Sequence, residues 1–324
     1  MKKFTSGLAA LLLVTLSMSA KAEWPEKPIK ILVPFPPGNS SDVSMRLLGE
    51  KLSTRLGQPV VIENRVGAGG TVGTAQAAKA APDGYTLAMG STGPLAIARS
   101  LRPDSLPYDA ARDFVAVGAV AWAPQVLAVR KDLPVSNVQE FLAYGRRPDA
   151  KLNYGSSGNG TTPHLVIAQL VHQTSMKADH IPFQGGSQAL TSLIGGQIDF
   201  ISDNVPVVQG ALTGGRVKAL AVTSGTRIPS LPDVPTLKEQ GVKDFDLQGW
   251  ILLVAPKGLP EPISNKLNAA VEAIMKMPDV RQKLLDMGLV PMDMPRADLG
   301  KFLQSEQLKW ASVVKISGAA ETTR

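Results

Sequence analysis

An apolar strand that runs through a rigid loop directly into a helix is the feature that most constrains the fold of this chain. Residues 29–33 are Ile-Lys-Ile-Leu-Val, residues 34–38 are Pro-Phe-Pro-Pro-Gly, and the polar residues 39–42 open an amphipathic segment. Such a strand–helix unit is the repeating element of α/β proteins. The loop would aim unpaired main-chain N–H groups and the positive end of a helix dipole at one point, which predicts a site for an anion, most simply a carboxylate. A plain connection with an internally satisfied cap is the alternative.

The same alternation of strand and helix signals continues along the chain. Helical periodicity at Met45, Leu48, Leu52 and Leu56 ends at Gly57, and an Ala-rich helix is expected at about 71–80. Further strands are predicted at 60–64, 85–89, 114–121, 125–130, 199–202, 217–223 and 250–254, and three helices with apolar stripes close the chain. The pattern predicts an α/β protein whose sheets are covered by helices on both faces.

The N-terminus has the features of an export signal. Lys2 and Lys3 form a basic start, residues 8–18 are largely apolar, and Ala20-Lys21-Ala22 is a small-x-small cleavage site. We therefore expect residues 1–22 to be removed. The chain contains no Cys, so it has neither a disulfide nor a thiolate nucleophile, and an exported protein of this kind fits a bacterial periplasm.

The length of the chain indicates how many domains it can form, and its charge limits the classes of partner that it can bind. The whole chain has 34 basic and 27 acidic residues; removing Lys2, Lys3 and Lys21 leaves 31 against 27, a net charge of +4 over 302 residues. That length allows two domains with substantial cores. The positive charge is spread along the chain without Lys/Arg runs, so we do not expect a nucleic-acid partner.

Two later loops also favour ligand binding. Residues 153–165 read Asn-Tyr-Gly-Ser-Ser-Gly-Asn-Gly-Thr-Thr-Pro-His-Leu, in which glycines allow close backbone approach and hydroxyls offer hydrogen bonds. Residues 181–187 read Ile-Pro-Phe-Gln-Gly-Gly-Ser, and a strand at 198–201 ends at Ser202-Asp203-Asn204. Asp203 can accept from a ligand ammonium or hydroxyl group, or cap the following helix. Strand ends that lead into helices are where α/β sheets place ligands.

Catalytic patterns are weak, so an exported enzyme is the least favoured function. His164, His172 and His180 lie eight residues apart, which does not match the i, i+4 pairing of a helical metal site. Neither Ser-containing glycine loop has the G-x-S-x-G pattern of a nucleophile. The glycines at 67–73 depart by one position from a dinucleotide fingerprint, and there is no Walker lysine. We expect no metal and no cofactor.

A series of motifs resembles one family along nearly the whole chain. In order, they are Val33-Pro34-Phe35-Pro36-Pro37-Gly38 with Asp42, Glu63-Asn64-Arg65 followed by Gly67-Ala68-Gly69-Gly70, Pro82-Asp83-Gly84-Tyr85-Thr86-Leu87, Tyr108-Asp109 with Arg112-Asp113-Phe114, Tyr154-Gly155-Ser156-Ser157-Gly158-Asn159-Gly160, Gly195-Gly196-Gln197-Ile198-Asp199, and Leu231-Pro232-Asp233-Val234-Pro235-Thr236 with Glu239 and Gly241. Together they resemble the Bug-type periplasmic solute-binding proteins, the receptors of tripartite tricarboxylate transporters. Asn39 stands where that family usually has a second glycine.

The resemblance implies a type II periplasmic binding protein fold, in which two α/β domains enclose a ligand cleft. The domains would be residues 23–122 plus 248–324, and residues 123–247. Main-chain N–H groups and waters, rather than an arginine, would hold a ligand carboxylate. The implied binding residues are Phe35, Gly38, Asn39, Ser40, Asp42, Ser156, Ser157, Gly158, Asn159, Thr161 and His164, with Ser91, Thr92, Gln184, Gly185, Gly186, Asp203 and Asn204 as secondary candidates.

The implied partners are a small carboxylate and a membrane protein. An amino acid, a di- or tricarboxylate and an aromatic acid all remain open as ligands. The membrane partner is either the permease subunits of a transporter or a sensor kinase to which the receptor presents its ligand. We expect the receptor to be a monomer.

Overall fold

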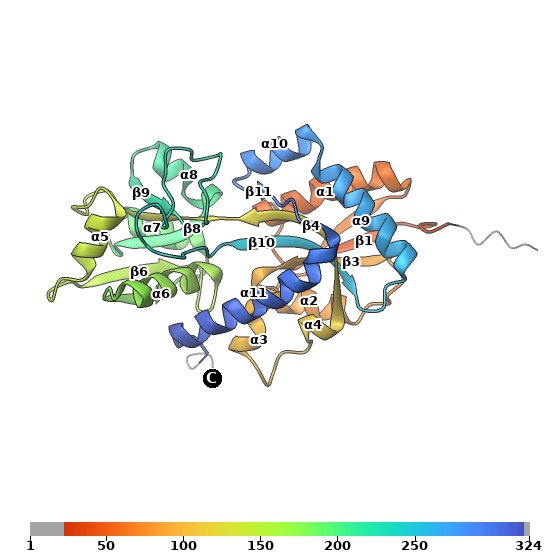
Figure 1. Cartoon of the computed structure of the whole chain (residues 1–324), viewed down its shortest axis with the longest axis horizontal. Helices are drawn as coiled ribbons and strands as arrows, with labels where there is room; N and C mark the ends of the chain where they lie inside the picture. Colours follow the sequence, from red (N-terminus) through yellow and green to blue (C-terminus); the bar gives the residue numbers. More distant parts are fainter. Residues whose placement is uncertain (1–22, 321–324) are drawn as a thin grey trace, which may run out of the picture.

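The computed structural model describes residues 23–320, so the predicted signal segment lies outside the described residues. These residues form two mixed sheets, one on each side of the elongated molecule in Figure 1, and helices cover both sheets. No helix among the described residues is long and apolar enough to cross a membrane.

The first sheet has the strand order β11-β4-β10-β3-β1-β2. Its strands are β1 (Ile29–Val33), β2 (Val60–Asn64), β3 (Thr86–Ser91), β4 (Phe114–Ala123), β10 (Gly249–Pro256) and β11 (Val290–Pro291). β1 pairs in parallel with β2 and β3, whereas β10 is antiparallel to β3 and β4. Ile31 and Leu32 are both buried and belong to the cores on opposite faces of the sheet. Burial on both faces explains the continuous apolar run at the start of the chain.

The second sheet has the same kind of order, β7-β6-β8-β5-β9. Its strands are β5 (Gln125–Arg130), β6 (Leu152–Ser156), β7 (Ala178–Pro182), β8 (Phe200–Asn204) and β9 (Val217–Val222). β6 pairs in parallel with β7 and β8, and β5 is antiparallel to β8 and β9. Only Pro124 separates β4 from β5, so the chain passes almost directly from one sheet into the other.

Helices pack on both faces of the two sheets. They are α1 (Ser40–Leu56), α2 (Thr71–Ala78), α3 (Ala98–Leu101), α4 (Ala110–Asp113), α5 (Val138–Gly145), α6 (Thr162–Thr174), α7 (Gly186–Ile194), α8 (Val205–Thr213), α9 (Glu261–Met275), α10 (Pro278–Asp286) and α11 (Arg296–Ser317), with short turns η1 (Ala68–Gly70) and η2 (Gly93–Ile97). Met45, Leu48 and Leu52 of α1 are buried, as their spacing predicts. Gly57 ends α1 at φ 70°, a left-handed conformation that glycine adopts at little cost.

We call the part of the molecule built on the first sheet the first half and the part built on the second sheet the second half. The long C-terminal helix α11 lies along both halves (Figure 1). It contacts η2 and β4 in the first half and α6 in the second. Trp250 on β10 and Trp310 on α11 both donate their indole N–H to Oε2 of the buried Glu306, at 2.8 and 3.0 Å. The bond from Trp250 fastens α11 to a strand of the first sheet, and the bond from Trp310 lies within α11.

Candidate functional site

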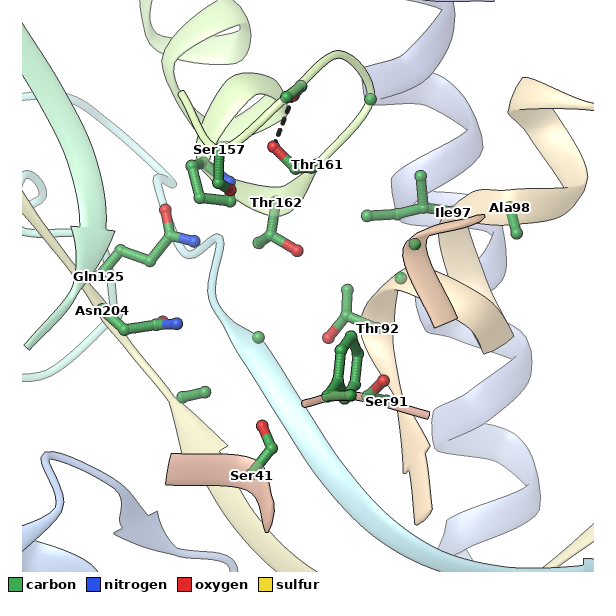
Figure 2. Close-up of a pocket in the computed structure, with 18 of the residues that line it drawn as sticks. Ser41, Ser91, Thr92, Ile97, Ala98, Gln125, Ser157, Thr161, Thr162 and Asn204 are labelled. Carbon is green, nitrogen blue, oxygen red and sulfur yellow. Dashed lines mark hydrogen bonds between the residues drawn. The ribbon is translucent and has the colours of Figure 1, made fainter. Parts of the chain in front are cut away.

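A cavity of about 550 Å³ lies where the loops of the two sheets face each other. The first half contributes residues near the start of α1 and the end of β3, and the second half contributes the loop before α6 and the end of β8. Figure 2 shows Ser41, Ser91 and Thr92 from the first half with Ser157, Thr162 and Asn204 from the second around this space. The cavity therefore gathers the loop before α1, the loop before α6 and the end of β8, whereas no residue of the predicted loop at 181–187 lines it.

The start of α1 offers unpaired donors to the cavity. Asn39 caps the helix, because its side chain accepts from the N–H of Asp42 at 2.8 Å and its carbonyl from that of Val43 at 2.9 Å. Within residues 23–320, nothing accepts from the N–H groups of Ser40 and Ser41, and both residues line the cavity. Orphan N–H groups at the positive end of a 17-residue helix favour an anion.

The start of α6 is arranged in a similar way. The Thr161 hydroxyl donates to the carbonyl of Gly158 at 2.7 Å, the bond drawn in Figure 2. Pro163 has no N–H to satisfy, and the N–H of Thr162 has no acceptor among the described residues. The cavity is thus bordered by the N-termini of two long helices, one from each half.

Neutral side chains supply further hydrogen-bonding capacity. Ser91 is 7% exposed and lines the cavity, and its Oγ has no hydrogen-bond partner in the part of the chain that the structure describes. Thr92 Oγ1 accepts from the N–H of Trp250 at 2.9 Å and keeps its own proton. Gln125 Oε1 accepts from Ser202 Oγ at 2.7 Å, which leaves its amide nitrogen directed into the cavity (Figure 2). A buried hydroxyl without a partner is uncommon, and it can accept or donate a hydrogen bond to a bound molecule.

Two lining residues carry charged groups. Asp203 is buried, and of the described residues only Asn204 donates to it, through its N–H at 2.8 Å. Burial raises the pKa of Asp203 to about 6, although this one hydrogen bond opposes the shift. Arg102 is exposed at the end of α3, with no ion pair to its guanidinium among the described residues. The interior is therefore largely neutral, with one acidic side chain inside and one basic side chain that reaches the surface.

Most of the residues predicted from the sequence line this cavity. They are Phe35, Asn39, Ser40, Ser91, Thr92, Ser157, Gly158, Asn159, Thr161, Asp203 and Asn204. The predicted residues that do not line it are Gly38, Asp42, Ser156, His164, Gln184, Gly185 and Gly186. Whether any of these residues touches a ligand remains a prediction.

Gly38 and Asp42 instead hold the first loop together. Asp42 is 1% exposed and accepts from the N–H of Gly38 at 2.9 Å, from Arg46 at 2.9 and 3.0 Å, and from Asn64 at 2.7 Å. Burial opposes ionisation, but these donors together lower the pKa of Asp42. The N–H of Gly38, expected to face the ligand, is therefore already used within the protein.

The other predicted residues that do not line the cavity bond to neighbouring residues, and Gln184 is exposed at the surface. Ser156 bonds to His180, and His164 accepts from the N–H of Gly160. The N–H of Gln184 donates to the side chain of Gln188, and Gly186 lies against the carboxylate of Asp203. Gly186 has no room for a side chain, because an added Cβ would lie 2.3 Å from Asp203 Oδ2.

Sequence reasoning missed four lining residues of interest: Ser41, Gln125, Thr162 and Arg102. Ser41 and Thr162 stand beside predicted residues at helix starts, so helix phase could have identified them. Gln125 follows Pro124 at the point where the chain changes sheets. Arg102 carries no local signal, since only the fold brings the end of α3 to the cavity.

Comparison with known proteins agrees with this architecture. Residues 44–319 match the model of the tripartite tricarboxylate transporter family receptor. Protein BugT of Bordetella pertussis is 34% identical over 297 residues, which cover 91% of each chain. A Rhodopseudomonas palustris structure with adipate has 33% identity and a TM-score of 0.81, and it covers 91% of this chain and 98% of its own. MatC from the same organism, with bound malate, has 35% identity and a TM-score of 0.76, covering 90% and 99%.

These similarities confirm the predicted family and the α/β periplasmic binding protein fold. Because the family consists of solute-binding receptors, the protein is a receptor and not an enzyme. Members of known structure include the periplasmic binding protein BugD, at 32% identity and a TM-score of 0.75 over 91% of this chain and 99% of that one. The chain belongs to the receptor family of the tripartite tricarboxylate transporters.

Proposed function

We propose that this protein is a periplasmic receptor that binds a small carboxylate between its two halves and delivers it to a membrane transporter. One observation carries the proposal: Ser40, Ser41 and Thr162, at the starts of two long helices from different halves, line one cavity, and their N–H groups have no acceptor within residues 23–320. The unpartnered buried hydroxyl of Ser91 supports it. A carboxylate can exchange its hydration for such charge-assisted bonds and stay ionised.

Dicarboxylates are the first ligands to test. Adipate and malate are present in structures similar to this one, and a cavity of about 550 Å³ has room for either. Asp203 favours a ligand with a hydroxyl or ammonium donor, and Phe35 provides an apolar surface. Among the described residues, Arg102 is the only basic side chain that lines the cavity, and it is exposed, so main-chain donors take the role of carboxylate anchor in the proposal.

The proposal includes the domain division expected from the sequence, residues 23–122 plus 248–324 and residues 123–247. Strands at 29–123 and 249–291 make up the first sheet, and strands at 125–222 make up the second. A single copy of the chain supplies both walls of the cavity, which supports a monomeric receptor.

A thermal-shift screen of carboxylates, followed by calorimetry, tests the binding proposal. A ligand at 100 times its Kd should stabilise the protein by about 2.7 kcal/mol. Each acid is paired with its neutral amide, which has the same shape without the charge. If amides bind as tightly as acids, or if no carboxylate binds, the proposal is wrong.

Delivery is tested separately by co-purification from membranes with and without the identified ligand. Recovery of permease subunits supports transport. Recovery of a sensor kinase without permease subunits would replace transport with signalling and leave the binding proposal intact.

A further inference from the structure

Three stacked aromatic rings lie behind the loop that joins β6 to α6. The imidazoles of His164 on α6 and His180 on β7 have centroids 3.8 Å apart and planes within 5°. Tyr154 on β6 lies beside this pair, with centroids 4.9 Å from His180 and 6.2 Å from His164 and interplanar angles of 26° and 24°. His164 and Tyr154 are 3% and 4% exposed. The stack joins the three elements of the second half that meet beneath the ligand loop.

Each imidazole makes one hydrogen bond that restrains that loop. His180 Nε2 lies 2.7 Å from Ser156 Oγ, which in turn lies 3.0 Å from the carbonyl oxygen and 3.2 Å from the nitrogen of Gly158. His164 Nδ1 accepts from the N–H of Gly160 at 3.0 Å. Because Ser156 has one hydroxyl proton, which Gly158 O accepts, this network is satisfied when His180 donates from Nε2.

These hydrogen bonds hold two glycines, Gly158 and Gly160, whose backbone conformations are unusual. Gly158 has φ 129° and Gly160 has φ 72°, so both lie outside the regions that ordinary residues prefer. Their N–H groups turn inward to Ser156 and His164 and not toward the cavity. That orientation leaves the N–H of Thr162 and the side chains of Ser157 and Thr162 at the cavity.

We propose that His164 and His180 are positioning residues that fix the loop at 157–161 in its ligand-binding conformation before a ligand arrives. The inference rests on the proposed function, because it assigns these histidines to the same site. Preorganised donors bind more tightly, since the cost of ordering the loop is met during folding. Both imidazoles act in their neutral forms: a protonated His164 has no Nδ1 lone pair for Gly160, and two cations 3.8 Å apart repel.

Paired substitutions separate the hydrogen bonds from ring stacking. His164→Asn and His180→Gln retain polar atoms near Nδ1 and Nε2, whereas His164→Phe and His180→Phe retain the rings without those atoms. His172→Gln is the control, because His172 is exposed and outside the stack. Affinity for adipate is measured by calorimetry at neutral pH, and loop order by amide hydrogen exchange of the ligand-free protein.

The Asn and Gln variants should bind adipate within about threefold of the unaltered protein and retain exchange protection in the loop. The Phe variants should lose about tenfold or more in affinity and lose that protection. Equal behaviour of Phe and Asn/Gln variants, whether all are harmed or none, would overturn the inference. His172→Gln should match the unaltered protein in both measurements.

Ser156→Ala is a second test, which keeps the proposal falsifiable if the histidine variants do not fold. It removes the acceptor of His180 together with the bonds between Ser156 and Gly158, and it leaves both imidazoles in place. Its effect should therefore be at least that of His180→Phe, and the Ser156→Ala/His180→Phe double variant should lose little more than Ser156→Ala alone. Independent, additive losses would contradict the inference. If the unaltered protein binds no carboxylate, the proposed function fails, but hydrogen exchange still decides whether the histidines order the loop.

Discussion

At the scale of single residues, the buried hydroxyl of Ser91 destabilises the ligand-free protein, and in the proposed function it binds the ligand. Its buried Oγ has no partner within residues 23–320, so Ser91→Ala should leave the free energy of unfolding unchanged or raise it by up to about 1 kcal/mol. The same change should weaken dicarboxylate binding about tenfold. Calorimetry and denaturant titration measure the two effects. Ser264→Ala is a matched control, because Ser264 Oγ is also buried and unpartnered but lies outside the cavity; it should leave affinity unaltered.

The stacked histidines make stability depend on pH. Burial lowers the pKa of His164 to about 3, with a smaller contribution from His180, and burial lowers that of His180 to about 4. Since the unfolded chain takes up these protons near pH 6.5, stability should fall as pH decreases from about 6.5 toward 4. For His164 the loss at pH 5 is about 2 kcal/mol.

Asp203 has the opposite effect on stability. Its raised pKa, about 6, makes the folded protein take up a proton before the unfolded chain does, which offsets about 1 kcal/mol of the loss at pH 5. Thermal melts at pH 7.5 and 5 check the net direction. The decrease should be smaller in His164→Asn, and an equal decrease would show that His164 does not contribute.

At the scale of elements, substitutions at the cap of α1 test what Asn39 contributes to stability. Its φ of −78° needs no glycine, and its side chain caps the N–H of Asp42. Asn39→Ala should cost about 1 kcal/mol of unfolding free energy, and Asn39→Gly only a few tenths. Urea titrations measure both. A larger loss for Gly than for Ala would mean that backbone restriction, and not the cap, is what Asn39 supplies.

The attachment of α11 depends on one buried carboxylate. Glu306→Leu would leave the indole N–H groups of Trp250 and Trp310 without an acceptor, at a cost of about 2–4 kcal/mol. Glu306→Gln retains one oxygen for both indoles and should cost less. Thermal unfolding with tryptophan fluorescence follows both variants. Equal losses would indicate that the charge, and its ion pair with Lys309, matters more than the acceptor.

At the scale of the whole molecule, a cavity lined from both halves favours closure around a ligand. Ser40 and Ser41 belong to one half and Thr162 to the other, so a ligand that bonds to all three stabilises the closed arrangement. The radius of gyration from small-angle scattering should decrease on saturation with a tight dicarboxylate. An unchanged radius would indicate that the halves do not move, and the matched neutral amide should produce no decrease.

The order of strands and helices was largely determined by local sequence. Residues 60–64 and 125–130 form strands with the predicted limits, and the helix predicted at 71–80 forms at Thr71–Ala78. These predictions succeed because periodicity and turn chemistry act over a few residues. The η2 turn and the short α3 helix were not anticipated, since packing against α11 supports them more than their own pattern does.

The anion-binding character of the loops could also be inferred from sequence, because orphan N–H groups at a helix start are a local property. Which side chains face the cavity was decided only by tertiary structure. Asp42 and His164 turn away to stabilise their loops, whereas Gln125 and Arg102 reach the cavity from segments without a binding motif. A polar side chain can bond inward or face a ligand, and the choice depends on neighbours that are distant in sequence.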